Sequence, residues 1–403
     1  MQSEVDSRPA GSPDDPGRAA LAKAIGTLVT AGAAGVQIRV NDGRGEWVGT
    51  AGVAERGSSR PVPPDGRFRI GSVTKTYVAA VLLLLAGDGE LSLDDPVSRY
   101  LPRFGLDERI TVRMILMHVS GVFDFSGEHG LDETSDCGIF PTSGETYVKD
   151  LESTYEPDEL VRFSLAKPAR FAPGATFGYS NTNYILAGLL IEKVTGAGYA
   201  QQVHDRIVAP LGLTETSVPG RRTAIPGPHA HGYLGYRDAG TWKVADVTRY
   251  NPSRYWAAGE IISTTRDVDA FLLALLDGRL LPPPLLAEMT SFIPPGSGLG
   301  VSTGLFRREF TPGHTGIGHF GSVPGYLCSA YSTVDGGVRL VMSVTKGAVD
   351  RFDPVAFSRF QRAVDATLVA CFSSLVPPGS KRAPGGLPDG RLRGPAGLLP
   401  LPR

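Results

Sequence analysis

Ser72 and Lys75 stand three residues apart where an apolar helix is predicted to begin. The helical spacing of the apolar residues between Val78 and Leu85 supports that helix. Residues three apart on a helix share a face, so the Lys75 amine can approach the Ser72 hydroxyl near the positive end of the helix. A serine hydroxyl is a weak nucleophile until a neighbouring base takes its proton. The pair therefore indicates acyl transfer through Ser72, although a helix cap and a solvated lysine give the same local pattern.

Two other serine motifs match short catalytic patterns, and their context argues against both. Ser343 and Lys346 repeat the same spacing, but they end an alternating strand, where residues three apart point to opposite faces. Ser302 lies in a G-x-S-x-G pattern, which needs a strand, a sharp turn and then a helix. The residues from Leu305 to Phe310 have no helical period. We therefore expect neither serine to be the nucleophile.

Tyr179 and Asn181 form a second candidate group on a loop just before another predicted helix. A phenol has a pKa near 10, and it becomes a usable base if a cation such as Lys75 stabilises its ionised form. The Asn181 amide can hydrogen-bond substrate or lysine. A packed tyrosine and a capping asparagine remain the alternative, because both residues are common in loops.

A third group, His319 to Ser322, directly precedes the last predicted strands. Gly321 permits a close approach, and the backbone N–H of Ser322 is expected to pair with that of Ser72 as an oxyanion hole. We expect His319 to orient or polarise the substrate, while His314 competes for that role and a structural histidine is the alternative. Two aromatic residues, Trp256 and Tyr255, are expected either to line the pocket or to pack in the core.

The elements that must position these groups come from both ends of the chain. Residues 36–40 and 46–53 alternate around a turn and predict an early hairpin, and residues 326–333 and 338–345 predict a late one. The middle is mainly helical, and a final helix is expected over residues 354–371. This order predicts an α/β (α+β) fold, in which helices flank one antiparallel sheet and form a second subdomain. The domain is expected at residues 18–372, with sheet segments at about 18–70 and 290–372 and disordered tails at 1–17 and 373–403.

Composition excludes several function classes. The 40 Lys and Arg residues balance the 41 Asp and Glu residues, so we expect no nucleic-acid partner, and no apolar run is long enough to span a membrane. Three scattered cysteines, Cys137, Cys328 and Cys371, argue against a disulfide framework and a zinc cluster, and are interpreted as buried or free thiols. We expect no cofactor and no metal. The first ten residues lack a secretory signal, which predicts a cytoplasmic location if Met1 is the true start.

In this order, the three groups resemble the serine β-lactamase and penicillin-binding protein superfamily, in particular its class C-like branch of D-alanyl-D-alanine carboxypeptidases and esterases. The resemblance covers about residues 30–370 and implies a β-lactamase/transpeptidase-like fold with an acyl-enzyme on Ser72. It also implies Lys75 as the partner of Ser72, Tyr179 as the general base, Asn181 as a substrate-contact amide and His319 as the third-motif residue. Five further stretches are similar to that branch: Gly89 to Val97, Ile110 to Arg113, His118 to Gly121, Pro210 to Leu213 and Ala258 to Thr264.

Two departures bear on the substrate. The similar carboxypeptidases have a threonine after the third-motif histidine and an arginine on the preceding strand that holds a terminal carboxylate. This chain has Phe320 and, by spacing, Phe306 in those places, with Arg307 and Arg308 adjacent. We therefore favour a serine hydrolase or acyltransferase that acts on an ester, amide or thioester of a small molecule or peptide. A D-stereospecific peptidase, carboxypeptidase or β-lactamase and a non-catalytic penicillin-binding-like scaffold are the alternatives.

Overall fold

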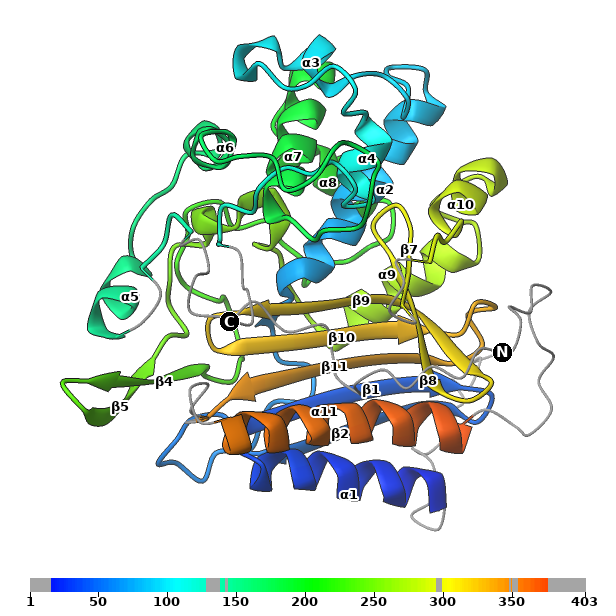
Figure 1. Ribbon diagram of the computed structural model, residues 1–403. Coiled ribbons are helices and arrows are strands. Elements are labelled where there is room, and N and C mark those ends of the chain that lie inside the picture. Colours follow the sequence, from blue (N-terminus) through cyan, green and yellow to red (C-terminus); the bar gives the residue numbers. More distant parts are fainter. Residues whose placement is uncertain are drawn as a thin grey trace, which may run out of the picture.

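The computed structural model describes residues 16–127, 138–141, 144–294, 299–347, 349 and 354–375. Its centre is an antiparallel sheet of seven strands in the order β2-β1-β11-β10-β9-β8-β7 (Figure 1). The strands are β1 (Ala33–Asp42), β2 (Gly45–Gly52), β7 (Leu299–Val301), β8 (Phe306–Thr311), β9 (His314–Val323), β10 (Tyr326–Ser332) and β11 (Arg339–Lys346). The predicted class, an antiparallel sheet flanked by helices, is confirmed.

Both predicted hairpins are present, and they join in the middle of the sheet. The early pair is β1 and β2, with Val40 opposite Trp47, and the late pair is β10 and β11, with Tyr326 opposite Thr345. Strand β1 also pairs with β11, so that Val36 lies opposite Val344. The first and last strands of the chain therefore belong to one continuous sheet, as the sequence predicts.

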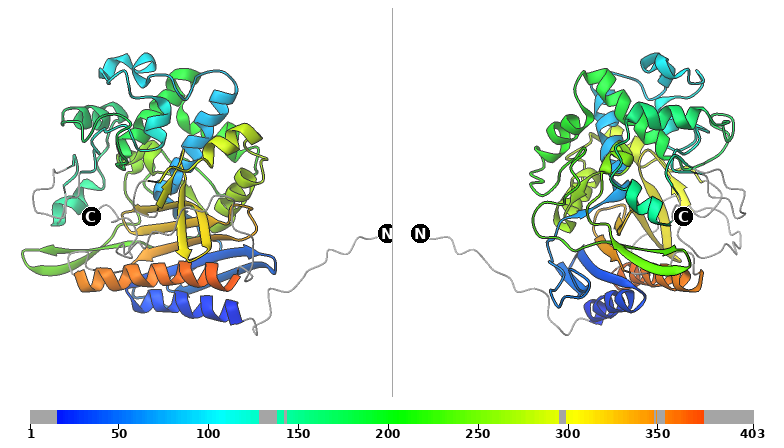
Figure 2. Two further views of the ribbon diagram at one scale, coloured as in Figure 1. Left: turned by 45° about the vertical axis from the view of Figure 1, so that its right-hand side comes forward. Right: turned by 90° about the vertical axis from the view of Figure 1, so that its left-hand side faces the viewer.

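Two helices cover one face of this sheet: α1 (Pro16–Thr30) and α11 (Pro354–Leu375) (Figure 2). They pack through buried apolar residues such as Leu28 and Leu368. Helix α1 corrects the expectation that the chain opens with sheet, because buried Leu21, Ile25 and Leu28 recur with helical spacing. Helix α1 begins at Pro16 and α11 ends at Leu375, so both extend slightly beyond the predicted domain bounds of 18–372. The rest of both predicted tails lies outside the described residues.

A mainly helical part covers the other face, as predicted. Its centre is α2 (Thr74–Gly87), which is buried on nearly all sides and packs against α7 (Asn181–Thr195). The short helices around them are α3 (Val97–Tyr100), α4 (Val112–Leu116), α5 (Gly144–Asp150), α6 (Pro157–Leu165), α8 (Tyr199–Val203) and α10 (Pro283–Met289). The other short elements include β3 (Phe68–Arg69), which pairs with β6 (Ile262–Ser263), and the hairpin of β4 (Tyr233–Asp238) and β5 (Thr241–Asp246).

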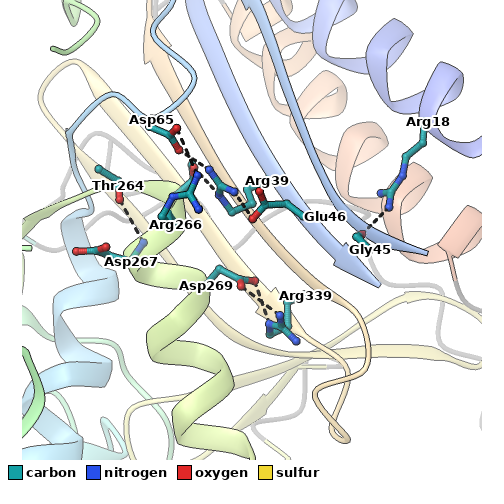
Figure 3. Close-up of polar contacts among 11 residues, drawn as sticks. Arg18, Arg39, Gly45, Glu46, Asp65, Thr264, Arg266, Asp267, Asp269 and Arg339 are labelled. Carbon is teal, nitrogen blue, oxygen red and sulfur yellow. Dashed lines mark hydrogen bonds and ion pairs between the residues drawn. The ribbon is translucent and has the colours of Figure 1, made fainter. Parts of the chain in front are cut away.

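Helix α9 (Thr265–Leu276) lies against this face and is tied to it by ion pairs (Figure 3). Arg339 of β11 binds both carboxylate oxygens of Asp269, at 3.0 and 3.2 Å. Asp65 pairs with Arg39 of β1 and, at 3.5 Å, with Arg266 of α9. These contacts tie the first turns of α9 to the sheet.

The described residues bear on two expectations from the sequence, one about the cysteines and one about membrane-spanning segments. Cys328 and Cys371 are buried free thiols, as predicted, whereas Cys137 lies outside the described residues. None of the helices in the described part of the chain combines the length and apolarity needed to cross a bilayer.

Candidate active site

The three predicted groups meet at the start of α2. Ser72 lies in the 3-10 turn η1 (Gly71–Val73), which leads directly into α2 and packs on β9 and β10. The Lys75 Nζ atom is 2.9 Å from Ser72 Oγ. The Tyr179 hydroxyl lies on another side and donates to Ser72 Oγ, also at 2.9 Å. One hydroxyl therefore contacts an amine and a phenol from a segment more than a hundred residues away.

Lys75 is fully buried and has two further acceptors. Its Nζ atom donates to Asn181 Oδ1 at 2.8 Å and to the Ala258 carbonyl at 2.6 Å. Burial lowers the pKa of Lys75 to about 7, and the negative charge of Asp124 opposes that shift. A neutral amine has two N–H groups, which these two carbonyl oxygens occupy. Its lone pair then faces the Ser72 hydroxyl, so the geometry suits Lys75 as a proton acceptor.

The Tyr179 phenol is protonated in this environment. Burial raises the pKa of Tyr179 well above its usual value of 10, and the charge of Asp124 raises it further, while the hydrogen bond to Ser72 opposes the rise. The sequence prediction made Tyr179 a usable base on the condition that the Lys75 cation stabilises its ionised form. Burial favours the neutral amine of Lys75 and the protonated phenol of Tyr179, and this favours Tyr179 as a proton donor to Ser72.

Asp124 belongs to the site although sequence reasoning missed it. Its carboxylate accepts from Asn181 Nδ2 at 3.0 Å and from the Ser126 backbone N–H at 2.9 Å. The first bond turns the Asn181 amide so that its oxygen faces Lys75. Burial raises the pKa of Asp124, and Lys75 is among the groups that lower it. Nothing in its local sequence marks Asp124, except that it follows the His118 to Gly121 stretch by three residues.

His319 lies on β9 beside this group and is neutral. Burial and the nearby Lys75 charge lower the pKa of His319 to about 3. Its Nδ1 donates to the Phe320 carbonyl at 2.6 Å, which leaves Nε2 as the acceptor. The ring meets Phe306 of β8 edge to face, with centroids 4.8 Å apart. His319 can therefore accept a hydrogen bond, but it cannot supply a positive charge near neutral pH.

Gly71, just before Ser72, and Gly321 on β9 allow η1 and β9 to come into close contact. A Cβ on Gly321 would lie 2.0 Å from the Ile70 oxygen and 2.8 Å from the Ser72 nitrogen. A Cβ on Gly71, whose φ is +53°, would lie 3.0 Å from the Ser322 nitrogen. The backbone nitrogens of Ser72 and Ser322, which were predicted as the oxyanion hole, therefore lie close together where η1 contacts β9. The Ser322 hydroxyl accepts from Lys346 Nζ at 3.1 Å.

Two predicted pocket residues have contacts in the apolar cores. Phe320 packs against the apolar cluster on the side of α1 and α11, and its ring also lies 5.8 Å from Phe306 and 5.7 Å from His319, centroid to centroid. The Trp256 ring meets Tyr199 at a centroid distance of 4.6 Å, and a Cβ on Gly188 of α7 would lie 2.7 Å from it. Core packing, the alternative weighed for Trp256, accounts for these contacts.

The rival motifs have structural roles. Ser302 is buried and donates to the Met289 carbonyl at 2.6 Å, and strand β8 follows it where an elbow needs a helix. Its rejection as a nucleophile elbow is confirmed. Ser343 and Lys346 lie on strand β11, as predicted. His314 opens β9, and its Nδ1 forms a hydrogen bond with Thr311 Oγ1 at 2.7 Å.

Comparison with known proteins gives a consistent picture. A family model described as Beta-lactamase matches residues 21–358. Esterase EstB of Burkholderia gladioli is 34% identical over 184 residues. That match covers 43% of this chain and 45% of the esterase, so the chain spans less than half the length of this curated relative.

Two solved structures are similar over most of their length. A D-stereospecific amidohydrolase from Streptomyces sp. is 38% identical, with a TM-score of 0.74, and the match covers 83% of this chain and 95% of that chain. A D-amino acid amidase from Ochrobactrum anthropi SV3 is 30% identical, with a TM-score of 0.74, over 89% of this chain and 99% of that chain.

Proposed function

The chain belongs to the beta-lactamase family, and we propose that it is a serine hydrolase that cleaves an ester or amide through an acyl-enzyme on Ser72. The observation that carries the proposal is the pair of 2.9 Å contacts that Ser72 Oγ makes with Lys75 and Tyr179. A nucleophile with a base and a proton donor in hydrogen-bond reach is the arrangement that acyl transfer requires.

The contacts support one direction for each proton transfer. Lys75 takes the Ser72 proton as Oγ forms a bond to the substrate carbonyl carbon, because its two N–H groups are already held by Asn181 and Ala258. The negative oxygen of the intermediate lies between the N–H groups of Ser72 and Ser322, each worth about 2.7–4 kcal/mol in the transition state.

Collapse of the intermediate breaks the carbon–nitrogen or carbon–oxygen bond. Tyr179 protonates the departing amine or alcohol, and the proton held by Lys75 then replaces the one that Tyr179 has given. Water attacks the acyl-enzyme in the reverse sense and releases the acid. An amine or alcohol that outcompetes water gives acyl transfer through the same steps.

The side chains near His319 favour substrates without a free terminal carboxylate. Phe306 is buried against His319, and by its spacing in the sequence it stands where similar carboxypeptidases have a carboxylate-binding arginine. Arg308 is paired with Asp365 of α11 at 2.8 Å, and Arg307 lies over the Phe292 ring at 5.3 Å. Neither arginine supplies the missing charge, which supports esters and amides over carboxypeptidase substrates.

A second candidate is hydrolysis of D-amino acid amides. The two solved structures with 38% and 30% identity are named for D-stereospecific amide hydrolysis. This candidate uses the same acyl-enzyme and differs only in the acyl group that the pocket accepts.

Active-site labelling tests the proposal. A fluorophosphonate probe should add one adduct to the wild type, located at Ser72 by peptide mass spectrometry, and no adduct to Ser72→Ala. Lys75→Ala and Tyr179→Phe should label at least about 100-fold more slowly. Ser302→Ala is the matched control and should label at the wild-type rate. An unlabelled folded wild type would favour the non-catalytic scaffold.

A substrate panel separates the candidates. Nitrophenyl esters, the amides of D- and L-phenylalanine and D-alanyl-D-alanine should be compared on the wild type, with Ser72→Ala as the blank. We expect turnover of esters or amides and none of the dipeptide. Preference for D-phenylalanine amide over its L form would select the second candidate, and preference for the dipeptide would contradict the substrate assignment.

A further inference from the structure

His118 has a left-handed backbone conformation, which is strained for a residue with a side chain. It follows the C-cap of α4, at Met117, and has a φ of +56°. Glycine is the usual residue at this place after a helix, because a Cβ clashes in the left-handed region. Only Ala239 and Trp256 share a positive φ with His118 among the described non-glycine residues. A histidine held in this way needs contacts that over-determine it, and such residues cluster at functional sites.

His118 binds the chain on both sides of Tyr179. Its carbonyl accepts from the Gly178 N–H at 2.9 Å, and its Nδ1 accepts from the Ser180 N–H at 3.2 Å. Between these two bonds, the imidazole stacks on the Tyr179 ring, with centroids 4.2 Å apart and planes inclined by 28°. One residue therefore restrains the backbone before and after the phenol, and also one face of its ring.

Buried hydrogen bonds keep Nδ1 of the His118 imidazole unprotonated, so that it can accept from the Ser180 N–H. Asn183 Nδ2 lies 3.3 Å from His118 Nδ1, and Asn183 Oδ1 accepts from Ser120 Oγ at 2.6 Å. Both neighbours of Nδ1 are donors, so Nδ1 is unprotonated and the proton is on Nε2. Burial is the main cause that keeps the pKa of His118 well below its usual value, and the positive charge of Arg170 acts in the same direction. The ring is therefore neutral.

We propose that His118 is a positioning residue, which holds the Tyr179 phenol at hydrogen-bond distance from Ser72 by clamping both flanking peptide groups and stacking on the ring. The proposal rests on the proposed function, because it concerns the same acylation step. A phenol that loses this support keeps its chemistry but spends less time aligned with Ser72 Oγ and the leaving group. Misplacement by about 1 Å can cost about 100-fold in rate.

Two substitutions at His118 separate positioning from folding. His118→Gly suits the left-handed backbone and removes the ring, so we expect a folded protein whose kcat for a nitrophenyl ester falls about 10- to 100-fold with little change in KM. His118→Asn tolerates the same backbone and offers a carbonyl oxygen to the Ser180 N–H, so it should recover a large part of that loss. Ala239→Gly, a matched change at an exposed left-handed residue of the β4–β5 turn, should leave kcat unchanged.

A double-mutant cycle tests whether His118 acts through Tyr179. Labelling by the fluorophosphonate is followed for hours, so that slow variants remain measurable. In the Tyr179→Phe background, His118→Gly should slow labelling less than about twofold, because the phenol that it positions is gone. An equal loss in both backgrounds, or a His118→Gly variant with wild-type kcat, would overturn the proposal. Failure of the wild type to label at Ser72 would instead overturn the proposed function.

Discussion

At the scale of single residues, the site depends on how two opposing effects set the charge of Lys75. Complete burial favours the neutral amine, and the negative charge of Asp124 favours the ammonium, with the result that the pKa of Lys75 falls to about 7. The same amine without burial would be charged at neutral pH and unable to take the Ser72 proton. Asp124 limits the shift and also orients Asn181, so it influences Lys75 by charge and by geometry.

The pH dependence of acylation should follow Lys75. Only the neutral amine accepts the Ser72 proton, so the labelling rate of the wild type should fall as pH drops below about 7. Stopped-flow or timed-quench labelling across pH 5–9 measures this limb. A rate that stays flat down to pH 5 would show that another group is the base.

Substitution of Asp124 should move that limb in a predictable direction. Asp124→Asn removes the negative charge that raises the pKa of Lys75, so the pKa should fall and the acid limb should shift to lower pH. The maximal rate should also drop, because the new amide cannot accept from both Asn181 and Ser126 as the carboxylate does. Glu145→Gln, on the exposed surface of α5, is the control and should leave the profile unchanged.

The sequence predicted the reacting atoms better than their charges. Ser72, Lys75 and Tyr179 were predicted to converge from their order along the chain, and they do meet. The role of Tyr179 as general base stays a prediction, and the burial that favours its protonated form is a property of the packed site that leaves no mark on the local sequence. Asp124 and the role of His118 were missed for the same reason, since both act on neighbours that are about sixty residues away.

At the scale of elements, α9 supports the segment that carries one of the Lys75 acceptors. Residues 258–264 run from the Ala258 carbonyl through β6 to the N-terminus of α9. Hydrogen bonds from Ile70 N to the Ile261 oxygen and from Ile261 N to Thr74 Oγ1 tie this segment to the Ser72 turn. The ion pairs of α9 with Asp65 and with Arg339 of β11 therefore help to hold the acceptor in place.

Breaking the Asp269–Arg339 pair should destabilise the fold. Both side chains are largely buried, with 11% and 12% exposed, and Asp269→Asn would leave the Arg339 charge without its partner. We expect a loss of about 2 kcal/mol in the free energy of unfolding, measured by urea denaturation. The comparison is Glu145→Gln, which breaks the exposed pair with Lys149 and should cost less than about 0.5 kcal/mol. Equal effects of the two changes would contradict this account.

Elements were predicted from sequence where their local pattern was strong. Both hairpins have alternating strands and clear turns, and their pairing is confirmed. Helix α1 was missed although Leu21, Ile25 and Leu28 have helical spacing, because the residues before it indicated a tail. The place of Phe306 opposite Gly318 depends on the pairing of β8 with β9, a long-range contact that periodicity does not define.

At the scale of the whole molecule, the sheet separates two apolar cores. One lies between the sheet and the helices α1 and α11, and the other surrounds α2 and α7 on the side of Ser72. Changes in the first core should therefore affect stability without altering the contacts of the nucleophile, as long as the protein remains folded.

Leu368→Ala tests this separation. Leu368 is fully buried in α11, and its truncation should cost about 2–5 kcal/mol of unfolding free energy through lost burial and a cavity. Below the unfolding temperature, kcat for an ester should remain within about twofold of the wild type. Val355→Ala, in the same helix but at a residue that is 73% exposed, should change stability by less than about 0.5 kcal/mol. A large loss of kcat in folded Leu368→Ala would show that the two cores are coupled.

Helices α1 and α11 lie together on the face of the sheet opposite α2, the helix that follows Ser72 (Figure 1). A linker joined near Pro16 or Leu375 would therefore attach on the side of the sheet that carries α1 and α11. Coupled to a bead or a carrier through either helix, the protein would stand with its nucleophile toward the bulk solution, where reagents arrive by free diffusion.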